Sequence, residues 1–600
     1  MSVYIYLRHQ DLFDKRSRLS TLKRRLGQFN LSNVLFTLTR INVLLSRQAI
    51  LRENKEKQQG LQELLISNYL DPDLVEGILK PRFGHFSADE RPIFFRQQIL
   101  NLLRMCILIC REDATMTTEG KSRGAYELGR CCLMMNDHLV SAKEERATST
   151  GTDRKQRRHI SLQTAPNIEL NNPPQAARAI VRAEALFSEI LHSDGMSATL
   201  KKELPGFDLE SAFKAATGLS IDEYKEVVLT MISFVVARTP DEIMNHAGLF
   251  RRSEIIKGTR ITPDQFAGYL ALDSMSLAEA KARFANRTTK LLPQFDYVWF
   301  RRWPLLRLDD DILGWADPCF MVERLSSGIY WIIVDSLKGR DKDGALKAFG
   351  FLFENYAAEM LQLFPQRDGM FIDQPKYTNG DKSVDGIIHC GDTLIMIESK
   401  GSFMDIAAKY SGKIRRFEGD LDKKFGLDPK KGTEKGIAQL AKHIERLFPK
   451  QLPLRDHINE LDSALLASHS RIEKITPVLI VREPILRFSG VEEMLSDRFL
   501  RLLKQRRVSH SVKINPLAVI DIDTLEEMKP NLVAGDFTLQ QCLNVRAARD
   551  PLYRSSWHDF LVESFPEFAT KADEEVNAKF ESIMDRGTRN LFGDGISSVQ

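Results

Sequence analysis

The stretch SVDGIIHCGDTLIMIESKG, residues 383–401, decides the fold of the C-terminal part of this 600-residue chain. In its first half, polar and apolar residues alternate enough for a strand. A glycine-containing turn follows at 390–392, and the second half is apolar almost to its end. Runs of this kind around a short turn are typical of a β-hairpin. The stretch therefore predicts two neighbouring antiparallel strands in a sheet.

Three charged side chains stand at one end of this predicted hairpin, Asp385, Glu398 and Lys400. Glu398 and Lys400 are expected on the same face because side chains alternate along a strand. The turn folds the first strand back beside the second, so Asp385 can approach Glu398. Two carboxylates and a lysine at the ends of apolar strands are costly to bury without a partner, and a divalent cation satisfies them. The pattern predicts metal-assisted phosphodiester hydrolysis, with Lys400 near the attacking water.

Further expected elements surround the hairpin. A helix from Gly344 has an apolar face and contains Glu354, and a helix over 436–448 contains Gln439. The remaining expected elements are a strand at 370–372, a strand at 476–481, a helix at 491–504, a strand within 512–522 and a helix from 523. This order predicts a mixed sheet flanked by helices, an α/β domain over 341–590.

Asp385 followed by Glu398-Ser399-Lys400, set among these helices and strands, resembles the PD-(D/E)xK nuclease superfamily, which has the restriction-endonuclease-like fold. The resemblance covers about 140 of the 600 residues. It implies a Mg²⁺ or Mn²⁺ ion held by Asp385, Glu398 and the backbone carbonyl of Ser399. It also implies that Lys400 is the catalytic lysine.

Two more residues match positions that some members of this superfamily use. Glu354 matches a glutamate that the preceding helix adds to the site in many members, and Gln439 matches a glutamine on the following helix in several. One departure is that Val384 stands where a proline precedes the first acid. Many members lack this proline.

Other polar residues nearby have alternative interpretations. Asp373, close to the preceding strand, is a rival for the position of first acid, whereas Asp392 is expected to be a turn residue. His443 shares a helix face with Gln439, but it is more typical of a histidine at the surface or the edge of a core. A plain buried salt bridge of Lys400 in an ordinary α/β scaffold also remains open.

The local charge after the hairpin favours a polyanionic partner. Residues 400–450 contain 13 Lys or Arg and 7 Asp or Glu, an excess of +6, whereas the whole chain carries only +4. Such residues could neutralise phosphates without reading sequence, and a solvated loop is an equally good interpretation. The basic residues concerned are Lys409, Lys413, Arg415, Arg416, Lys423, Lys424, Lys430 and Lys431.

The rest of the chain is expected to be mostly helical. The sequence divides into a helical domain over 1–140, a polar linker over 141–176, a second helical domain over 177–293, a mixed connecting segment over 294–340 and a tail over 591–600. Within the connecting segment, 329–334 is aromatic and β-branched, which predicts a strand, and the polar segment 339–344 predicts a loop.

Composition predicts a cytoplasmic protein that does not meet a membrane. The seven cysteines are odd in number and form no CxxC pair, which indicates a reducing compartment without a disulfide framework or zinc spacing. No signal peptide is visible, and apolar stretches such as 227–237 fall short of the ~20 residues that span a bilayer.

These features together predict a Mg²⁺-dependent nuclease that acts on nucleic acid, with DNA the first choice and RNA an alternative. By analogy of fold, defence against foreign DNA fits such an enzyme. The helical N-terminal region could bind a protein partner or a second copy of the chain. The competing hypothesis from another class is a non-enzymatic interaction protein whose α/β part is an inactive scaffold.

Overall fold

The protein is seen in a computed structural model that describes most of the chain. The described residues are 6–51, 53–83, 92–139, 165, 169, 175–246, 248–286, 293–364, 369–377, 381–426, 432–448, 472–506, 508, 512–549, 556–569, 571 and 573–592. Most of the predicted linker 141–176 and of the predicted tail 591–600 lies outside these residues.

The described chain is mostly helical, with two small mixed β-sheets. The helices before the second sheet are α1 (His9–Phe13), α2 (Leu19–Leu26), α3 (Leu31–Leu51), α4 (Lys55–Tyr69), α5 (Pro72–Leu74), η1 (Val75–Leu79), α6 (Lys80–Phe83), α7 (Arg96–Ile109), α8 (Arg123–Asn136), α11 (Ala176–Glu184), η2 (Ala185–Ile190), α12 (Asp194–Glu203), α13 (Leu209–Thr217), α14 (Ile221–Val236), α15 (Pro240–His246), α16 (Arg252–Gly258), α17 (Pro263–Asp273), α18 (Leu277–Ala285), η3 (Pro293–Arg301), α19 (Pro318–Glu323), η4 (Arg324–Gly328), α20 (Ile329–Ser336) and α21 (Gly339–Gln362).

The first sheet has four short strands in the order β1 (Leu249–Arg251), β4 (Ile312–Trp315), β3 (Leu305–Arg307) and β2 (Ser274–Ser276). Strand β2 runs parallel to β3, and the other neighbours are antiparallel. The segment 177–293 was expected to be helical throughout, so β1 and β2 are additions to that expectation. Each is only three residues long, too short to produce an alternating pattern in the sequence.

The second sheet contains the hairpin and has the order β10 (Ala518–Asp521), β8 (Lys474–Val481), β7 (Thr393–Lys400), β6 (Gly386–Cys390) and β5 (Gly369–Asp373), with β9 (Lys513–Ile514) beside β8. Strands β5, β6 and β7 are antiparallel neighbours, and β7, β8 and β10 are parallel. The accompanying helices are α22 (Ile406–Lys409), α23 (Ile414–Phe425), α24 (Ile437–Leu447), η7 (Pro484–Arg487), α26 (Ser489–Gln505), α27 (Ile522–Ala534), α28 (Leu539–Ala548), α29 (Trp557–Ser564), η9 (Pro566–Ala569) and α30 (Glu574–Phe592). The expected mixed sheet flanked by helices is therefore present.

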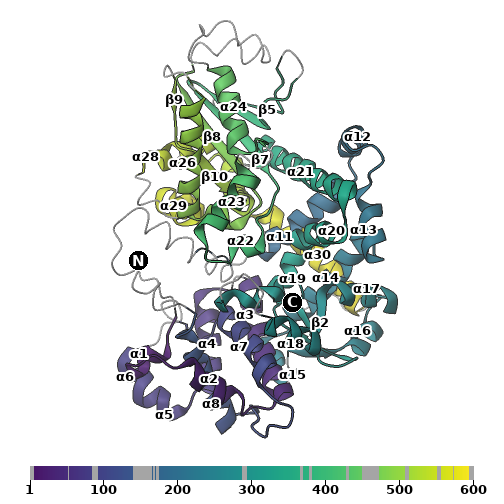
Figure 1. Ribbon diagram of the computed structural model, residues 1–600, viewed down its shortest axis with the longest axis vertical. Coiled ribbons are helices and arrows are strands. Elements are labelled where there is room, and N and C mark those ends of the chain that lie inside the picture. Colours follow the sequence, from purple (N-terminus) through teal and green to yellow (C-terminus); the bar gives the residue numbers. More distant parts are fainter. Residues whose placement is uncertain are drawn as a thin grey trace.

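Helices cover both faces of this sheet (Figure 1). One face of β7, with Leu394 and Met396, joins a core with α23, α24 and α26. The opposite face, with Ile395 and Ile397, joins a core with α21, α27 and α29. Because both faces are buried, the central strands are continuously apolar, as is usual for parallel strands.

A separate and larger core holds the helical part together. Its described members from Leu7 to Leu352 come from both sides of the boundaries that the sequence suggests near 176 and 293. Three residues of the C-terminal helix α30 also belong to it, Val576, Ile583 and Met584. In Figure 1 the yellow helix α30 accordingly lies among α11 and α14. The domain boundaries themselves stay predictions.

Two local expectations are wrong. Residues 329–334, predicted as a strand, form helix α20, and residues 339–344, predicted as a loop, form the first turns of α21. A short run of apolar and β-branched residues cannot distinguish a buried helix from a strand, and most of α20 is buried. The polar composition of 339–344 belongs to a mostly solvent-facing helix start, with Asp341 in its first turn.

Helix α3 is the one described helix whose length and composition would allow it to cross a membrane. It has 21 residues and a mean hydropathy of 1.3 in its most apolar window, of which 67% is buried inside the molecule. A buried central helix of a globular core has the same properties, so this observation is weak support for a membrane span.

Candidate active site at the end of the hairpin

The register of the hairpin brings Asp385 and Glu398 to the same place. Gly386 pairs with Ile397, so Asp385, one residue earlier, comes opposite Glu398. The Asp385 carboxylate accepts a hydrogen bond from the backbone N–H of Ser399, with Oδ2 2.7 Å from the nitrogen. This bond fixes the first acid against the end of β7.

Lys400 joins the two acids. Its Nζ lies 2.6 Å from Glu398 Oε1 and 3.9 Å from Asp385 Oδ2. The Glu398 side chain is only 2% exposed, whereas the Lys400 and Asp385 side chains are 15% and 25% exposed. The three predicted groups therefore converge, and Asp385 and Lys400 can be reached from solvent.

Helix α21 brings Glu354 to the same site. The helix lies so close to the end of β7 that a Cβ atom added at Gly401 would be 2.9 Å from Phe353 Cβ. Burial and the nearby Asp385 raise the pKa of the half-buried Glu354 to about 8, although Lys400 and Lys382 act in the opposite direction. Glu354 is therefore close enough to Asp385 and Glu398 for their charges to act on one another.

The pKa of the buried carboxyl group of Glu398 is raised in the same way. Burial raises its pKa to about 8, Lys400 opposes this effect, and Asp385 and Glu354 add to it. The pKa of Lys400 is itself raised despite burial, because Glu398, Asp385 and Glu354 surround it. Three carboxyl groups around one ammonium thus retain an excess of negative charge once they ionise.

This donor set fits a hard divalent cation. Glu398 Oε1 is buried, and although it lies near Lys400 Nζ it has no hydrogen bond of acceptable geometry. Carboxylate oxygens at such a place are the ligands that Mg²⁺ and Mn²⁺ prefer. Asp385 and Glu398 could hold the ion. The observed contact of Ser399 with Asp385 is through its N–H, so the proposed use of its carbonyl as a ligand stays a prediction.

Gln439 is in a different situation. It lies on α24, which packs against β7, but its Oε1 accepts a hydrogen bond from the N–H of Gly436 at 2.9 Å and so caps the start of its own helix. Among the described residues, its side chain forms no hydrogen bond with Asp385, Glu398 or Lys400. Its role in the site stays a prediction.

The charge of Lys400 acts on His443, which the sequence did not predict. Burial, helped by Lys442, Arg446 and Lys400, lowers its pKa to about 4. Its Nδ1 is 2.9 Å from the Tyr377 hydroxyl, and the two rings stack. A neutral histidine with a fixed partner thus lines the neighbourhood of Lys400, a feature that single-sequence reasoning could not separate from a core-edge histidine.

The two other acids considered lie at opposite ends of the hairpin. Asp373 ends β5 beside Gly386, and burial together with Asp385 raises its pKa, so it lies at the rim of the site. Asp392 lies in the turn, 3.0 Å from Lys474 Nζ, and its interpretation as a turn residue is confirmed.

The basic segment after β7 is only partly available to a polyanion. Lys409 is buried, with Nζ 2.8 Å from Glu169 and 2.5 Å from Glu483, so the expectation that it contacts phosphate is wrong. Its charge is neutralised inside the molecule. Lys413, Arg415 and Lys423 on or beside α23 are exposed, whereas Lys430 and Lys431 lie outside the described residues.

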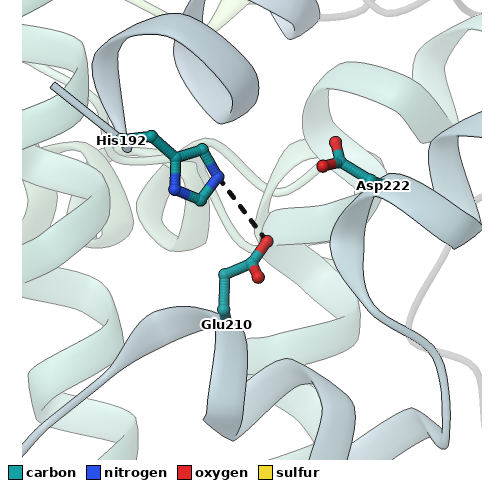
Figure 2. Close-up of side chains that lie close together, drawn as sticks. All are labelled: His192, Glu210 and Asp222. Carbon is teal, nitrogen blue, oxygen red and sulfur yellow. Dashed lines mark ion pairs between the residues drawn. The ribbon is translucent and has the colours of Figure 1, made fainter.

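A second group of possible metal ligands lies in the helical part. His192, Glu210 and Asp222 have ligand atoms within 4.8 Å of one another, and Figure 2 shows them on three separate segments. His192 Nε2 is 3.9 Å from Glu210 Oε1, and Asp222 Oδ1 is 3.0 Å from Lys225 Nζ. These ion pairs explain why the three side chains lie close together at the surface without a metal ion.

No family model, no curated protein and no solved structure matches this chain.

Proposed function

We propose that this chain is a metal-dependent nuclease that hydrolyses phosphodiester bonds of DNA. The observation that carries the proposal is the convergence of Asp385, Glu398 and Lys400 at a solvent-reachable end of the β6–β7 hairpin. Helix α21, the three antiparallel strands β5 to β7, the three helices α22 to α24 and the parallel strand β8 occur in that order around this hairpin. The same order supports assignment to the restriction-endonuclease-like fold of the PD-(D/E)xK superfamily.

Each residue has a definite role in this proposal. Asp385 and Glu398 would hold the ion, and Lys400 Nζ would hold the attacking water or donate to the charge that develops on phosphate. Glu354, whose pKa is about 8, can hold or release a proton beside them at neutral pH. Bound Mg²⁺ or Mn²⁺ would supply a more acidic water and neutralise negative charge on the phosphate.

DNA is the preferred substrate in this proposal, and RNA is the alternative. The exposed cations Lys413, Arg415 and Lys423 support contact with a phosphate backbone, which both nucleic acids offer. A role in defence against foreign DNA is compatible with cutting that does not depend on base sequence. The helical part would then serve as the surface for a partner or a second copy of the chain.

One observation favours a non-enzymatic scaffold as the second candidate. The 2.6 Å contact between Lys400 and Glu398 is the ion pair that an inactive α/β domain would also form. In a scaffold this pair would stabilise the strand end and need no metal. The two candidates differ in whether the pair opens to accept an ion.

The decisive experiment measures cleavage of supercoiled plasmid, linear duplex DNA and RNA by the full chain with Mg²⁺ and with EDTA. Glu398→Gln removes a charged ligand of the ion, and Lys400→Met removes the ammonium that acts on the water or the phosphate, so each should lower the rate on the order of 100-fold or more. Asp392→Asn is the matched control, because it changes an acid of the same hairpin at its other end. Equal cutting by all four proteins would refute the site, and binding without cutting would favour the scaffold.

A further inference from the structure

The connection between β5 and β6 is an ordered extension of the sheet beside the candidate site. Strand β5 ends and β6 begins at the edge of the sheet where Asp385 lies. The two arms of the connection are paired by backbone hydrogen bonds. The N–H of Ser383 donates to the carbonyl oxygen of Pro375, and the N–H of Tyr377 donates to that of Asp381, each at 2.9 Å.

These bonds place two lysines directly opposite each other, Lys376 and Lys382, which form an isolated antiparallel bridge. The hydrogen bonds on either side of the bridge belong to the flanking residues, so the lysines are a non-hydrogen-bonded pair. Side chains of such a pair lie on one face and come close together. Like charges at directly opposite positions are destabilising. This lysine pair therefore lowers the stability of the connection unless an anion lies nearby.

The described part of the protein supplies no such anion to the lysine pair. Both lysines are exposed, and no carboxylate among the described residues lies within ion-pair distance of either ammonium group. Glu354 is close enough to Lys382 for the two charges to interact, but they form no ion pair. Asp381, the neighbour of Lys382 in the chain, is engaged by Arg446, whose Nη1 lies 3.4 Å from its carboxylate.

The two faces of the connection differ in their surroundings. On one face, Tyr377 is only 2% exposed, and Arg446 Cζ lies 3.6 Å from the centroid of its ring. Lys382 lies toward α21 instead, with Nζ 5.7 Å from the centroid of the Phe351 ring, about one helical turn before Glu354. The connection is therefore anchored to α24 through Tyr377, and its lysine pair is left exposed beside the candidate site.

We propose that the lysine pair binds phosphates of the DNA backbone next to the bond that is cut. This inference rests on the proposed nuclease function, because it concerns how the substrate is held at that site. Lysine is a compact charge on a flexible stem, so two neighbouring lysines can follow phosphates of one strand without reading the base sequence. Lys376 and Lys382 would position the duplex, whereas Asp385, Glu398 and Lys400 would act on the reacting phosphate.

The salt dependence of DNA binding tests the proposal. A fluorescently labelled duplex is titrated with the full chain in EDTA at several salt concentrations, and fluorescence anisotropy reports binding. Lys376→Gln/Lys382→Gln should weaken binding at low salt about tenfold and make the slope of log affinity against log salt shallower by about 1.8, since each phosphate contact contributes about 0.9. Lys376→Arg/Lys382→Arg should retain the affinity and the slope, because it keeps both charges.

Lys257→Gln/Lys281→Gln is the matched control, since it removes the same charge from two exposed lysines that have no ion pair among the described residues. They lie on α16 and α18, away from the second sheet (Figure 1). The control should bind DNA as the unmodified chain does. Thermal unfolding without DNA should show Lys376→Gln/Lys382→Gln to be at least as stable as the unmodified chain, because it removes a like-charge pair.

Cleavage kinetics with Mg²⁺ separate positioning from chemistry. Lys376→Gln/Lys382→Gln should raise KM for duplex DNA about tenfold and leave kcat nearly unchanged, which is the effect of losing a contact made equally before and during the reaction. A lower kcat with unchanged KM would contradict the positioning role.

The lysine pair and the nuclease site can fail separately. Cleavage by the unmodified chain, with the same DNA affinity and salt slope in Lys376→Gln/Lys382→Gln, would overturn the inference and leave the nuclease. A shallower slope in this variant without cleavage by the unmodified chain would support the backbone contact and overturn the nuclease. The inference would also fail if the unmodified chain showed no saturable DNA binding, if the control lost as much affinity, or if the variant unfolded at a lower temperature.

Discussion

At Glu398, burial and a neighbouring lysine act on one carboxyl group in opposite directions. Burial is the larger effect, so the pKa rises to about 8 even though Lys400 Nζ lies 2.6 Å away. Glu354 has a pKa of about 8 for a similar reason. Without a metal ion, the folded protein therefore holds protons at neutral pH that free glutamate side chains would lose.

The raised pKa values of Glu354 and Glu398 make the free energy of unfolding depend on pH. Between about pH 4.5 and 8 the unfolded chain binds fewer protons at these two glutamates than the folded chain does, so their contribution to the free energy of unfolding falls as pH rises. Mg²⁺ binding must displace these protons, so its stabilising effect should be larger at about pH 8.5 than at about pH 6. Thermal unfolding with EDTA or Mg²⁺ at both pH values measures this difference. A Mg²⁺ effect that is the same at both pH values, or that persists in Glu398→Gln, would contradict the assignment.

At the scale of single elements, the contact between α21 and β7 decides whether Glu354 reaches the site. Gly401 makes this contact possible, since any side chain there would meet Phe353 and the carbonyl oxygen of Phe349. Glycine at this position is explained by close approach of two backbones. The same helix contains Gly350, where an added Cβ atom would meet nothing within 4 Å beyond the backbone of its own helix.

The two glycines should respond to alanine in opposite ways. Gly401→Ala should lower the free energy of unfolding by about 1–3 kcal/mol, because the added methyl group forces α21 and β7 apart. Gly350→Ala should raise it by about 0.5–1 kcal/mol, because alanine is the better residue in a helix interior with room for a methyl group. Chemical denaturation monitored by circular dichroism compares both variants. Two variants of equal stability would show that α21 is not held tightly against β7.

At the scale of the whole molecule, a buried charge cluster connects the helical part to the sheet. Arg182 on α11 is 4% exposed, and its Nη1 lies 2.7 Å from Asp523 and 3.0 Å from Glu526, both on α27. Glu526 also accepts a hydrogen bond from the Tyr356 hydroxyl of α21. With α30 in the same region, the two halves share an interface that includes both polar and apolar contacts.

Removal of the arginine should loosen this interface. Arg182→Ala removes the cation that pairs with the buried Glu526 and the partly buried Asp523, and loss of one partner of a buried ion pair typically costs about 3–5 kcal/mol. Hydrogen exchange should then become faster in α11 and α27. Arg178→Ala is the control. Arg178 also lies on α11, and its ion pair with Glu527 of α27 is longer, 3.7 Å, so its loss should lower the stability much less. Similar exchange in the two variants would show that the cluster does not hold the halves together.

The sequence by itself determined the hairpin and the grouping of Asp385, Glu398 and Lys400. Those features follow from the two-residue period of strands and the length of one turn, which are local properties. Only the tertiary structure decided that 329–334 is a helix, that Lys409 is buried, and that α30 returns to the N-terminal core. These outcomes depend on which distant surfaces remove a segment from water. A short apolar run, a lysine or an amphipathic helix is compatible with several such surfaces, so its own residues cannot select one.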